Sequence, residues 1–191
     1  MAPEPADCWR GARVRLRAVE PADWPTFFAW NQDSDSLRRS HWVPFPQSAA
    51  ATQRWAEQLA LAGPAHDTFR WMIENSAGAP VGTINSHSAD RRNGTFSYGL
   101  GVAPEHQRQG YASEAIILVL RYFFAELRYQ KVTVEVVSFN TPSRRLHERL
   151  GFQCEAQIRR LAFTQGQYFD HYVYGLTAEE FLDRYGSTSG L

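Results

Sequence analysis

The stretch from Val102 to Ala115 carries the residues best suited to hold an anion. It is typical of a strand end, a tight basic turn with one glycine, and the start of a long apolar helix. Free N–H groups and the positive end of the helix dipole would meet there, which suits a phosphate or pyrophosphate. Gly110 lets the backbone approach such a ligand or take a positive φ, although a turn may need glycine for geometry alone. Neither G-x-x-x-x-G-K-S/T nor G-x-G-x-x-G occurs, so a nucleotide triphosphatase and a dinucleotide-binding unit are not indicated.

A second segment, Asn140 to Phe152, follows a β-rich run and has the features of a short helix. Asn140 can cap its start and Gly151 can end it. Ser143 and His147 are four residues apart, so their side chains share one face of the helix. A hydroxyl and an imidazole placed together can donate hydrogen bonds or a proton near neutral pH. The alternative for His147 is simple packing beside the phenylalanine that closes the segment.

Together, the Gln107-x-x-Gly110-x-Ala112 turn and the Asn-x-x-Ser…Leu-Gly-Phe helix resemble the GNAT family of acetyl-CoA-dependent N-acetyltransferases. The segment Gly166–Leu176 looks like the closing hairpin of the branch that includes ribosomal-protein N-terminal-alanine acetyltransferases. The resemblance runs from about residue 13 to about residue 185. It implies acetyl-CoA as co-substrate, no metal, and direct attack of a primary amine on the thioester in a ternary complex.

The resemblance also implies where the coenzyme lies. The strand that ends at Val102 would splay from its neighbour and expose backbone groups to the pantetheine arm, with the Val102 N–H as the oxyanion donor. Asn140 would bind the pantetheine amides, or serve only as a helix cap. The expected coenzyme contacts are Leu100, Gly101, Val102, Gln107, Arg108, Gln109, Gly110, Tyr111, Ala112, Asn140 and Ser143.

The catalytic groups follow from the same resemblance. Ser143 is the preferred group to polarise or protonate the leaving thiolate, and His147, where many members have a tyrosine, is the second. Related enzymes often carry a glutamate base on the fourth strand, where this chain has Ser97. Glu135 and His87 are the substitutes, or no base is needed. An N-terminal α-amine has a pKa of about 7.7–8.0, against about 10.4 for lysine, which favours an α-amine as acceptor.

The acceptor site would lie among the first two helices, their connecting loop and the closing hairpin. Trp42, Phe45 and Tyr168 are candidates for its walls, and Trp30 is a further one. Asp170 could hold the incoming ammonium group or pair with an arginine within the fold. We expect a protein or peptide N-terminus as acceptor. A small-molecule amine (aminoglycoside, polyamine or amino acid) is the alternative, and a catalytically silent CoA-binding module is a third.

Composition sets the frame for these sites. The chain has 191 residues, of which 43% are hydrophobic and 14% aromatic, enough for a single domain over residues 1–191 with a core from about 13 to 185 and frayed ends. Twenty basic and twenty acidic residues argue against a general nucleic-acid binder. Two cysteines, Cys8 and Cys154, fit a reducing compartment. The longest apolar run, Ala115–Leu120, is too short to span a bilayer. We expect a cytoplasmic monomer or homodimer.

The elements that must position these residues predict an α/β (α+β) fold. Successive hairpin turns followed by two helical crossovers indicate a mixed sheet rather than an all-parallel one. The resemblance implies the rest: a mostly antiparallel sheet of six to seven strands, flanked by helices and splayed between strands four and five. The expected strands include 13–19, 69–74, 80–87, 95–102 and 131–137, with helices at 21–31, 49–61, about 112–127 and about 141–150.

Overall fold

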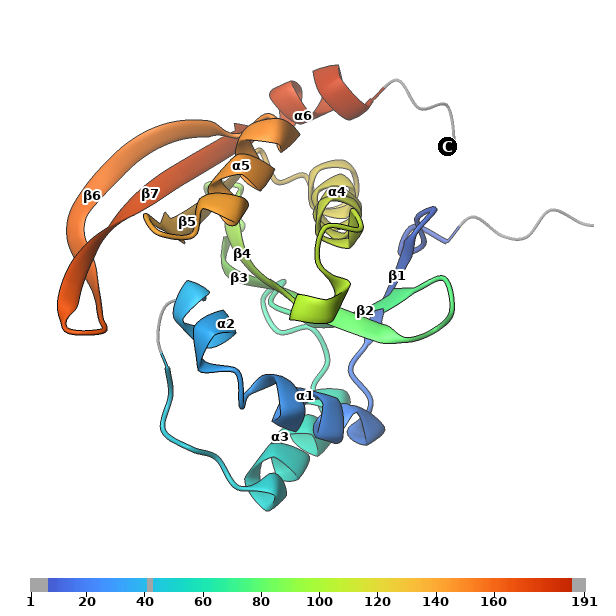
Figure 1. Cartoon of the computed structure of the whole chain (residues 1–191). Helices are drawn as coiled ribbons and strands as arrows, with labels where there is room; N and C mark the ends of the chain where they lie inside the picture. The colour runs from blue at the N-terminus through green and yellow to red at the C-terminus, as the bar shows by residue number, and fades with distance from the viewer. Residues whose placement is uncertain (1–6, 41–42, 187–191) are drawn as a thin grey trace, which may run out of the picture.

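A computed structural model describes residues 7–40 and 43–186. Within these residues, seven strands form one mixed sheet in the order β1-β2-β3-β4-β5-β7-β6 (Figure 1). All neighbouring pairs are antiparallel except β4 and β5, which confirms the expected mixed sheet. The strands are β1 (Val14–Ala18), β2 (Arg70–Asn75), β3 (Pro80–Asp90), β4 (Thr95–Val102), β5 (Lys131–Val137), β6 (Gln153–Thr164) and β7 (Gln167–Thr177).

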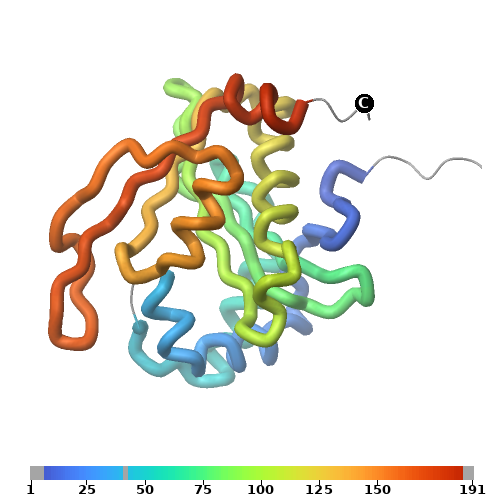
Figure 2. The backbone as a smooth tube through the Cα atoms, turned by 45° about the horizontal axis from the view of Figure 1, so that its top comes forward, coloured from blue at the N-terminus to red at the C-terminus, as the bar shows by residue number. Residues whose placement is uncertain are grey.

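The sheet opens between β4 and β5. These strands pair only at their starts, where Thr95 lies opposite Lys131 and Phe96 lies opposite Val132. From there the two strands diverge, as the tube in Figure 2 shows. A parallel pair that stops so early leaves later backbone N–H and C=O groups on both strands without sheet partners. The predicted splay is confirmed. The opening between the diverging ends of β4 and β5 is called the slot below.

One face of the sheet is covered by α4 (Tyr111–Ala125) and α5 (Thr141–Leu150). The buried residues of α4 recur at helical spacing because its wide apolar stripe faces the strands. Phe123 stacks on Phe96 of β4 with ring centroids 4.0 Å apart. On the same side, Phe124 meets Phe181 of α6 (Ala178–Tyr185) at 5.4 Å. This packing fixes the start of α4 relative to the open end of the sheet.

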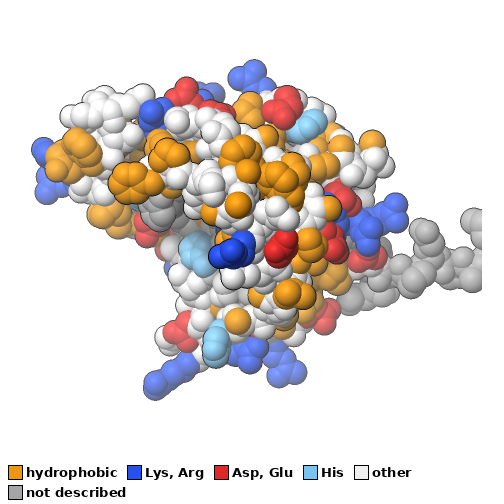
Figure 3. Space-filling view, turned by 90° about the horizontal axis from the view of Figure 1, so that it is seen from below, with side chains coloured by type: hydrophobic (Ala, Val, Ile, Leu, Met, Phe, Trp, Pro, Cys, Tyr) orange, Lys and Arg blue, Asp and Glu red, His pale blue; other side chains and the backbone are white. Residues whose placement is uncertain are grey.

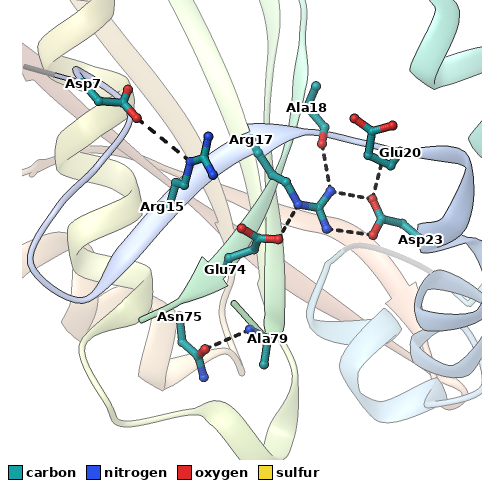
Figure 4. Close-up of polar contacts among 9 residues, drawn as sticks. All are labelled: Asp7, Arg15, Arg17, Ala18, Glu20, Asp23, Glu74, Asn75 and Ala79. Atoms are coloured by element: carbon teal, nitrogen blue, oxygen red, sulfur yellow. Dashed lines mark hydrogen bonds and ion pairs between the residues drawn. The ribbon is translucent and has the colours of Figure 1, made fainter. Parts of the chain in front are cut away.

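The opposite face carries η1 (Pro21–Asp23), α1 (Trp24–Trp30) and α3 (Ala49–Leu61). Met72 of β2 is fully buried there against Phe27 and Val19. Arg17 of β1 ties this layer to the sheet (Figure 4). Its guanidinium donates to both carboxylate oxygens of Asp23, at 2.7 and 2.8 Å, and to Glu74 of β2. Burial would raise the pKa of Asp23, but the hydrogen bonds from Arg17 and the backbone outweigh it and lower that pKa.

β6 and β7 form a long hairpin that projects beyond the rest of the sheet (Figure 1). The side chains of β6 are mostly exposed, including Ile158, Leu161 and Phe163. Seen from below, acidic and basic side chains are interspersed among hydrophobic ones rather than gathered into a patch of one sign (Figure 3). None of the helices in the described part of the chain is long and apolar enough to cross a membrane.

Two helices were missed by the sequence analysis. The first, α2 (Ser34–Arg39), is short and mostly polar, and is held by Asp33, whose carboxylate accepts from the N–H groups of Asp35 and Ser36. The second, α6, starts with a capping box between Thr177 and Glu180, and this Thr-x-x-Glu pattern can be recognised in the sequence. Helices this short have little hydrophobic periodicity, so capping residues are the main indication of them.

Candidate active site

The turn before α4 has the backbone geometry that an anion site needs. Gly110 is the N-cap with φ 85°, in the left-handed region, and its helix start has no side-chain cap. Arg108 is also left-handed, with φ 62°. These two conformations curl the chain so that the first N–H groups of α4 point out of the helix end without a side-chain acceptor at the cap position. The geometry suits a pyrophosphate, and the positive end of the helix dipole adds to it.

A cavity of about 470 Å³ adjoins this turn. Its lining includes Arg13, Arg108, Gln109, Gly110, Ser113 and Ile117. Arg13, whose Nη1 lies 3.4 Å from the Gln109 carbonyl oxygen, brings a second guanidinium to the turn. Glu114 holds that arginine's backbone in place, since its carboxylate accepts the N–H groups of Ala12, Arg13 and Val14 at 2.7–2.9 Å.

The other predicted turn residues differ in what their side chains do. The Gln107 side chain folds back, and its Nε2 donates to the Val102 carbonyl oxygen at 3.1 Å. The Tyr111 hydroxyl donates to Gln109 Oε1 at 2.9 Å. Ala112 lies half-buried in the first turn of α4. Gln107 therefore braces the end of β4, whereas Arg108 and Gln109 remain at the rim of the cavity.

The end of β4 presents backbone groups to the slot. The Ala103 N–H donates to the Val81 carbonyl oxygen at 3.0 Å, so this residue pair is a hydrogen-bonded one. Hydrogen-bonded and non-hydrogen-bonded pairs alternate in an antiparallel ladder, so Val102, opposite Gly82, points its N–H and C=O away from β3. Leu100 lies two residues before Val102 on β4, so its N–H and C=O also point away from β3. An alanine Cβ at Gly101 would meet nothing within 4 Å, so this strand end is open to a ligand.

The start of α5 lies on the β5 side of the slot. Asn140 caps the helix, and its Oδ1 accepts the Ser143 N–H at 3.3 Å. Its Nδ2 donates to the Arg39 carbonyl oxygen at 3.1 Å, which ties α5 to the end of α2 (Figure 2). Ser143 is half-buried, and its hydroxyl lies 3.4 Å from His147 Nδ1. The side chain of Asn140 thus makes structural contacts with both of its polar atoms.

His147 lies in the core rather than at the surface. Its Nδ1 lies 2.8 Å from the Ser143 carbonyl oxygen and its Nε2 lies 2.9 Å from the Tyr98 hydroxyl. A neutral ring that donates from Nδ1 and accepts at Nε2 satisfies both contacts. Burial lowers the pKa of His147, while the bond to the Ser143 backbone opposes that shift. Tyr98 is itself buried, which raises its pKa well above the usual value. Both ring nitrogens are thereby engaged.

A group of charged residues lies on the sheet face opposite α4. On β5, Val132, Val134 and Val136 pack in the core with α4, so Glu135 points to the other face. His171 of β7 lies opposite Val137, which places its side chain on the same face as Glu135. Their side chains meet, with Glu135 Oε2 3.2 Å from His171 Nδ1.

Two further residues approach this group from β2 and β3. His87 lies opposite Ser97, and its pKa is lowered by burial and by the positive charge of Arg70, while Glu135 opposes the shift. Arg70 lies over the ring of Trp55 in α3, 5.9 Å from its centroid. Four strands therefore contribute titratable side chains to one face, next to the point where β4 and β5 part.

The predicted acceptor residues make separate contacts where the structure describes them. Trp42 lies outside the described residues. Phe45 is 93% exposed, and Tyr168, on the β6–β7 hairpin, packs at an angle of 56° against Phe163 and lies under the Arg160 guanidinium. The Asp170 carboxylate accepts from Gln157 Nε2 at 2.6 Å and from a backbone N–H of β6 at 2.9 Å. These bonds lower the pKa of Asp170. Trp30 packs edge-on against a phenylalanine of α1.

Sequence reasoning did not identify Arg13, Tyr98, Glu114 or His171 as parts of the site. Each acts through a contact with a residue far away in the chain, such as Glu114 with the strand start about 100 positions earlier. For Tyr98 and His171, the only signal in the sequence was the alternation of side-chain direction along β4 and β7. Alternation indicates which face of the sheet a side chain occupies, but not which residue it contacts. The described residues hold no cluster of three or more histidine, cysteine or acidic side chains that would suit a metal.

Comparison with known proteins agrees with this geometry. Residues 13–153 match the family description "Acetyltransferase (GNAT) domain". The SPbeta prophage-derived uncharacterized N-acetyltransferase YokL of Bacillus subtilis (strain 168) is 42% identical over 178 residues, covering 93% of this chain and 97% of that protein. The spermidine N(1)-acetyltransferase of Vibrio cholerae is 25% identical, covering 91% and 98%.

Solved structures share the fold. A spermidine N-acetyltransferase from Vibrio cholerae, in complex with CoA and spermine, superposes with a TM-score of 0.77 at 22% identity, covering 90% of this chain and 99% of that one. The parallel β4–β5 opening and the uncapped turn before α4 suit an extended coenzyme that carries a pyrophosphate. The chain belongs to the GNAT acetyltransferases and is an acetyl-CoA-dependent N-acetyltransferase.

Proposed function

We propose that this enzyme acetylates the N-terminal α-amine of a protein or peptide, by direct attack of the amine on acetyl-CoA within a ternary complex. The observation that carries the proposal is the half-exposed carboxylate of Glu135, the only acidic side chain among the described residues of β4 and β5, the two strands that part. One carboxylate beside His87 and Arg70 suits an acceptor with one ammonium group. This acceptor class is the one expected of the ribosomal-protein N-terminal-alanine branch.

The coenzyme is held by backbone and basic groups in this proposal. The N-terminal N–H groups of α4, with Arg108 and Arg13 beside them, bind the pyrophosphate. The pantetheine arm runs into the slot along Leu100 and Val102, whose backbone groups face away from β3. The cavity beside Gly110 supports this path, because it lies directly at the uncapped helix end.

Acetyl transfer then needs three groups around the thioester. The amine nitrogen attacks the carbonyl carbon, and the Val102 N–H stabilises the oxyanion that forms. When the tetrahedral intermediate collapses, the C–S bond breaks and the coenzyme leaves as a thiolate. Ser143, half-buried at the start of α5, donates a hydrogen bond to that sulfur. His147 positions Ser143 and does not act as the acid, since both of its nitrogens are engaged.

A polycationic acceptor fits the acidic residues less well. Polyamines need several carboxylates spaced along a cleft. Of the acidic residues in α2, Asp33 caps the helix and Asp35 pairs with Arg38 at 2.5 Å. Arg70 would also place positive charge close to such a ligand. The similarity to a protein named as a spermidine acetyltransferase keeps a small-molecule amine as the second candidate.

A thiol-release assay with a matched panel of amines tests the proposal. The panel contains short peptides with free N-termini, the same peptides with blocked N-termini, spermidine, and free amino acids, each with acetyl-CoA. We expect release with the free peptides alone, with mass spectrometry locating the acetyl group on the α-nitrogen. Release with spermidine at an equal or higher kcat/KM, and none with peptides, would replace the proposal with the second candidate.

A further inference from the structure

The pairing of Glu135 with His171 assigns a role to a residue that the resemblance does not supply. The carboxylate is about half exposed, whereas the imidazole behind it is 6% exposed. Glu135 lies two residues before the end of β5, and His171, on the neighbouring strand β7, lies opposite Val137, the last residue of β5. An exposed carboxylate backed by a buried imidazole presents its outer oxygen to an incoming ligand.

Position along the strands places this pair at the reacting end of the slot. The last β4–β5 pair involves Val132, so Glu135 lies three residues into the opened part of β5. Across the opening, β4 offers Ser97 and Gly99 on the same face, where neither side chain can accept a proton from an ammonium group. The only carboxylate among the described residues of β4 and β5 is therefore Glu135.

We propose that Glu135 is the general base of the acetyl transfer and that His171 is a positioning residue that holds its carboxylate. The inference rests on the proposed function, since it assumes a primary amine that arrives as an ammonium ion. Glu135 takes one proton from the ammonium nitrogen, and the neutral amine forms the C–N bond. When the C–S bond breaks, its electrons leave with the coenzyme sulfur, and the attacking nitrogen loses a second proton, which neutralises the thiolate. The proton on Glu135 is released to water, so each turnover yields the amide, the free thiol and one proton.

Two further side chains lie on the same face as the pair. They are His87 from β3 and Arg70 from β2. His171 Nδ1 lies 3.2 Å from Oε2 of Glu135. This contact holds the carboxylate from one side, so that Oε1 takes the proton of the incoming ammonium group.

Glu135→Gln tests the base. It keeps the size of the side chain but removes its basicity. We expect kcat to fall about 10-fold with a peptide α-amine and about 100-fold with an alkylamine of higher pKa, because less of the latter is already neutral. The acetyl-CoA dissociation constant should not change. Glu155→Gln is the matched control, since Glu155 pairs with Lys131 at 2.6 Å on the outer strand β6. Equal turnover of Glu135→Gln and wild type would overturn the proposal.

His171→Gln tests the positioning role through its coupling to Glu135, which a purely structural role would not produce. We expect kcat to fall about 3- to 10-fold in His171→Gln. Glu135→Gln should then cause a smaller loss of kcat in that background than in wild type, because His171 acts through Glu135. Thermal unfolding of the variant, compared with wild type, reports any loss of folding. Wild-type kcat in His171→Gln, or losses that simply multiply in the double variant, would overturn the assignment.

Failure of the two proposals can be told apart. The acceptor class is read from wild type alone, as the amines that support thiol release. The role of the pair is read from the ratio of variant to wild type with whichever amine is accepted. A wild type that prefers spermidine would change the acceptor, while the drop in Glu135→Gln would still identify the base.

Discussion

The turn before α4 and the sheet face that carries Glu135 are built in different ways. The turn uses consecutive residues, because it takes its shape from left-handed φ values at Arg108 and Gly110. The sheet face gathers Arg70, His87 and Glu135 from three strands that are up to 65 positions apart. In the proposed function, the turn is the coenzyme side, where backbone geometry binds the pyrophosphate. The sheet face is the acceptor side, where strand register places the side chains.

This difference predicts that the coenzyme side fails when backbone conformation is disturbed. Gly110→Glu should weaken acetyl-CoA binding by at least about 100-fold, which corresponds to roughly 2.7 kcal/mol. The new side chain would be strained at φ 85°, would come within 3.4 Å of Arg13, and would put a negative charge at the phosphate site. Isothermal titration with acetyl-CoA measures the effect.

Gly78→Glu is the matched control for backbone strain. Gly78 has φ 76° in the β2–β3 turn, and a Cβ there would meet nothing within 4 Å. Gly78→Glu therefore introduces the same backbone strain and the same negative charge as Gly110→Glu, but away from the cavity beside the turn before α4. Equal affinities for the two variants would show that the turn before α4 does not bind the pyrophosphate.

The second prediction concerns the buried hydrogen bond between His147 of α5 and Tyr98 of β4, the elements on either side of the slot. His147→Phe should lower the free energy of unfolding by about 1–3 kcal/mol, because the Tyr98 hydroxyl would be buried without its 2.9 Å partner. For a chain of this size, each kcal/mol lowers Tm by about 2–4 °C. Tyr98→Phe in the same background should restore part of the loss, since it removes the unpaired hydroxyl.

The same residue makes a pH prediction with a definite sign. The pKa of His147 is lower in the folded state, so below about pH 6.5 the unfolded chain binds the proton more readily. The free energy of unfolding should therefore fall between pH 7.5 and pH 5, and the slope should be smaller in His147→Phe. His87 titrates in the same direction and keeps part of the slope. An identical slope in the variant would mean that His147 binds its proton equally well in the folded and the unfolded chain.

The same contrast explains how much the sequence could predict. Hydrophobic alternation and hairpin turns predicted strands β1 to β5, and Asn140 and Gly110 predicted two helix starts, because each of these signals lies within a few residues. The β4–β5 opening was expected only from the family resemblance. The pairing of Glu135 with His171, and of Tyr98 with His147, depends on strand order and register. Alternation assigns a side chain to a face, but only the assembled sheet selects its neighbour.

The third prediction separates chemistry from binding at the start of α5. Ser143→Ala should lower kcat about 10-fold, because the sulfur of the leaving coenzyme would lose its hydrogen-bond donor. The acetyl-CoA dissociation constant should stay within about 2-fold, since the pyrophosphate site lies on α4. Steady-state kinetics and titration measure the two quantities, with Ser76→Ala in the exposed β2–β3 turn as control. Turnover like that of wild type would exclude Ser143 from the mechanism.

The smallest effect is expected from Phe45, and it tests the acceptor side alone. Phe45 is 93% exposed, so Phe45→Ala should change the free energy of unfolding by no more than about 0.5 kcal/mol. An aromatic side chain that contacts the acceptor only in the ternary complex adds transition-state and ground-state binding equally. Its loss should raise the acceptor KM by about 3- to 10-fold and leave kcat unchanged.

Leu61→Ala is the control for that loss of exposed apolar surface, because Leu61 is 89% exposed at the end of α3. If both variants give the wild-type KM, the loop around Phe45 does not contact the acceptor, and specificity depends on the strand face that carries Glu135. If Phe45→Ala alone raises KM, the acceptor is recognised both by the exposed loop around Phe45 and by the strand face that carries Glu135. A different acceptor could then be accommodated by changing the loop while the base stays in place.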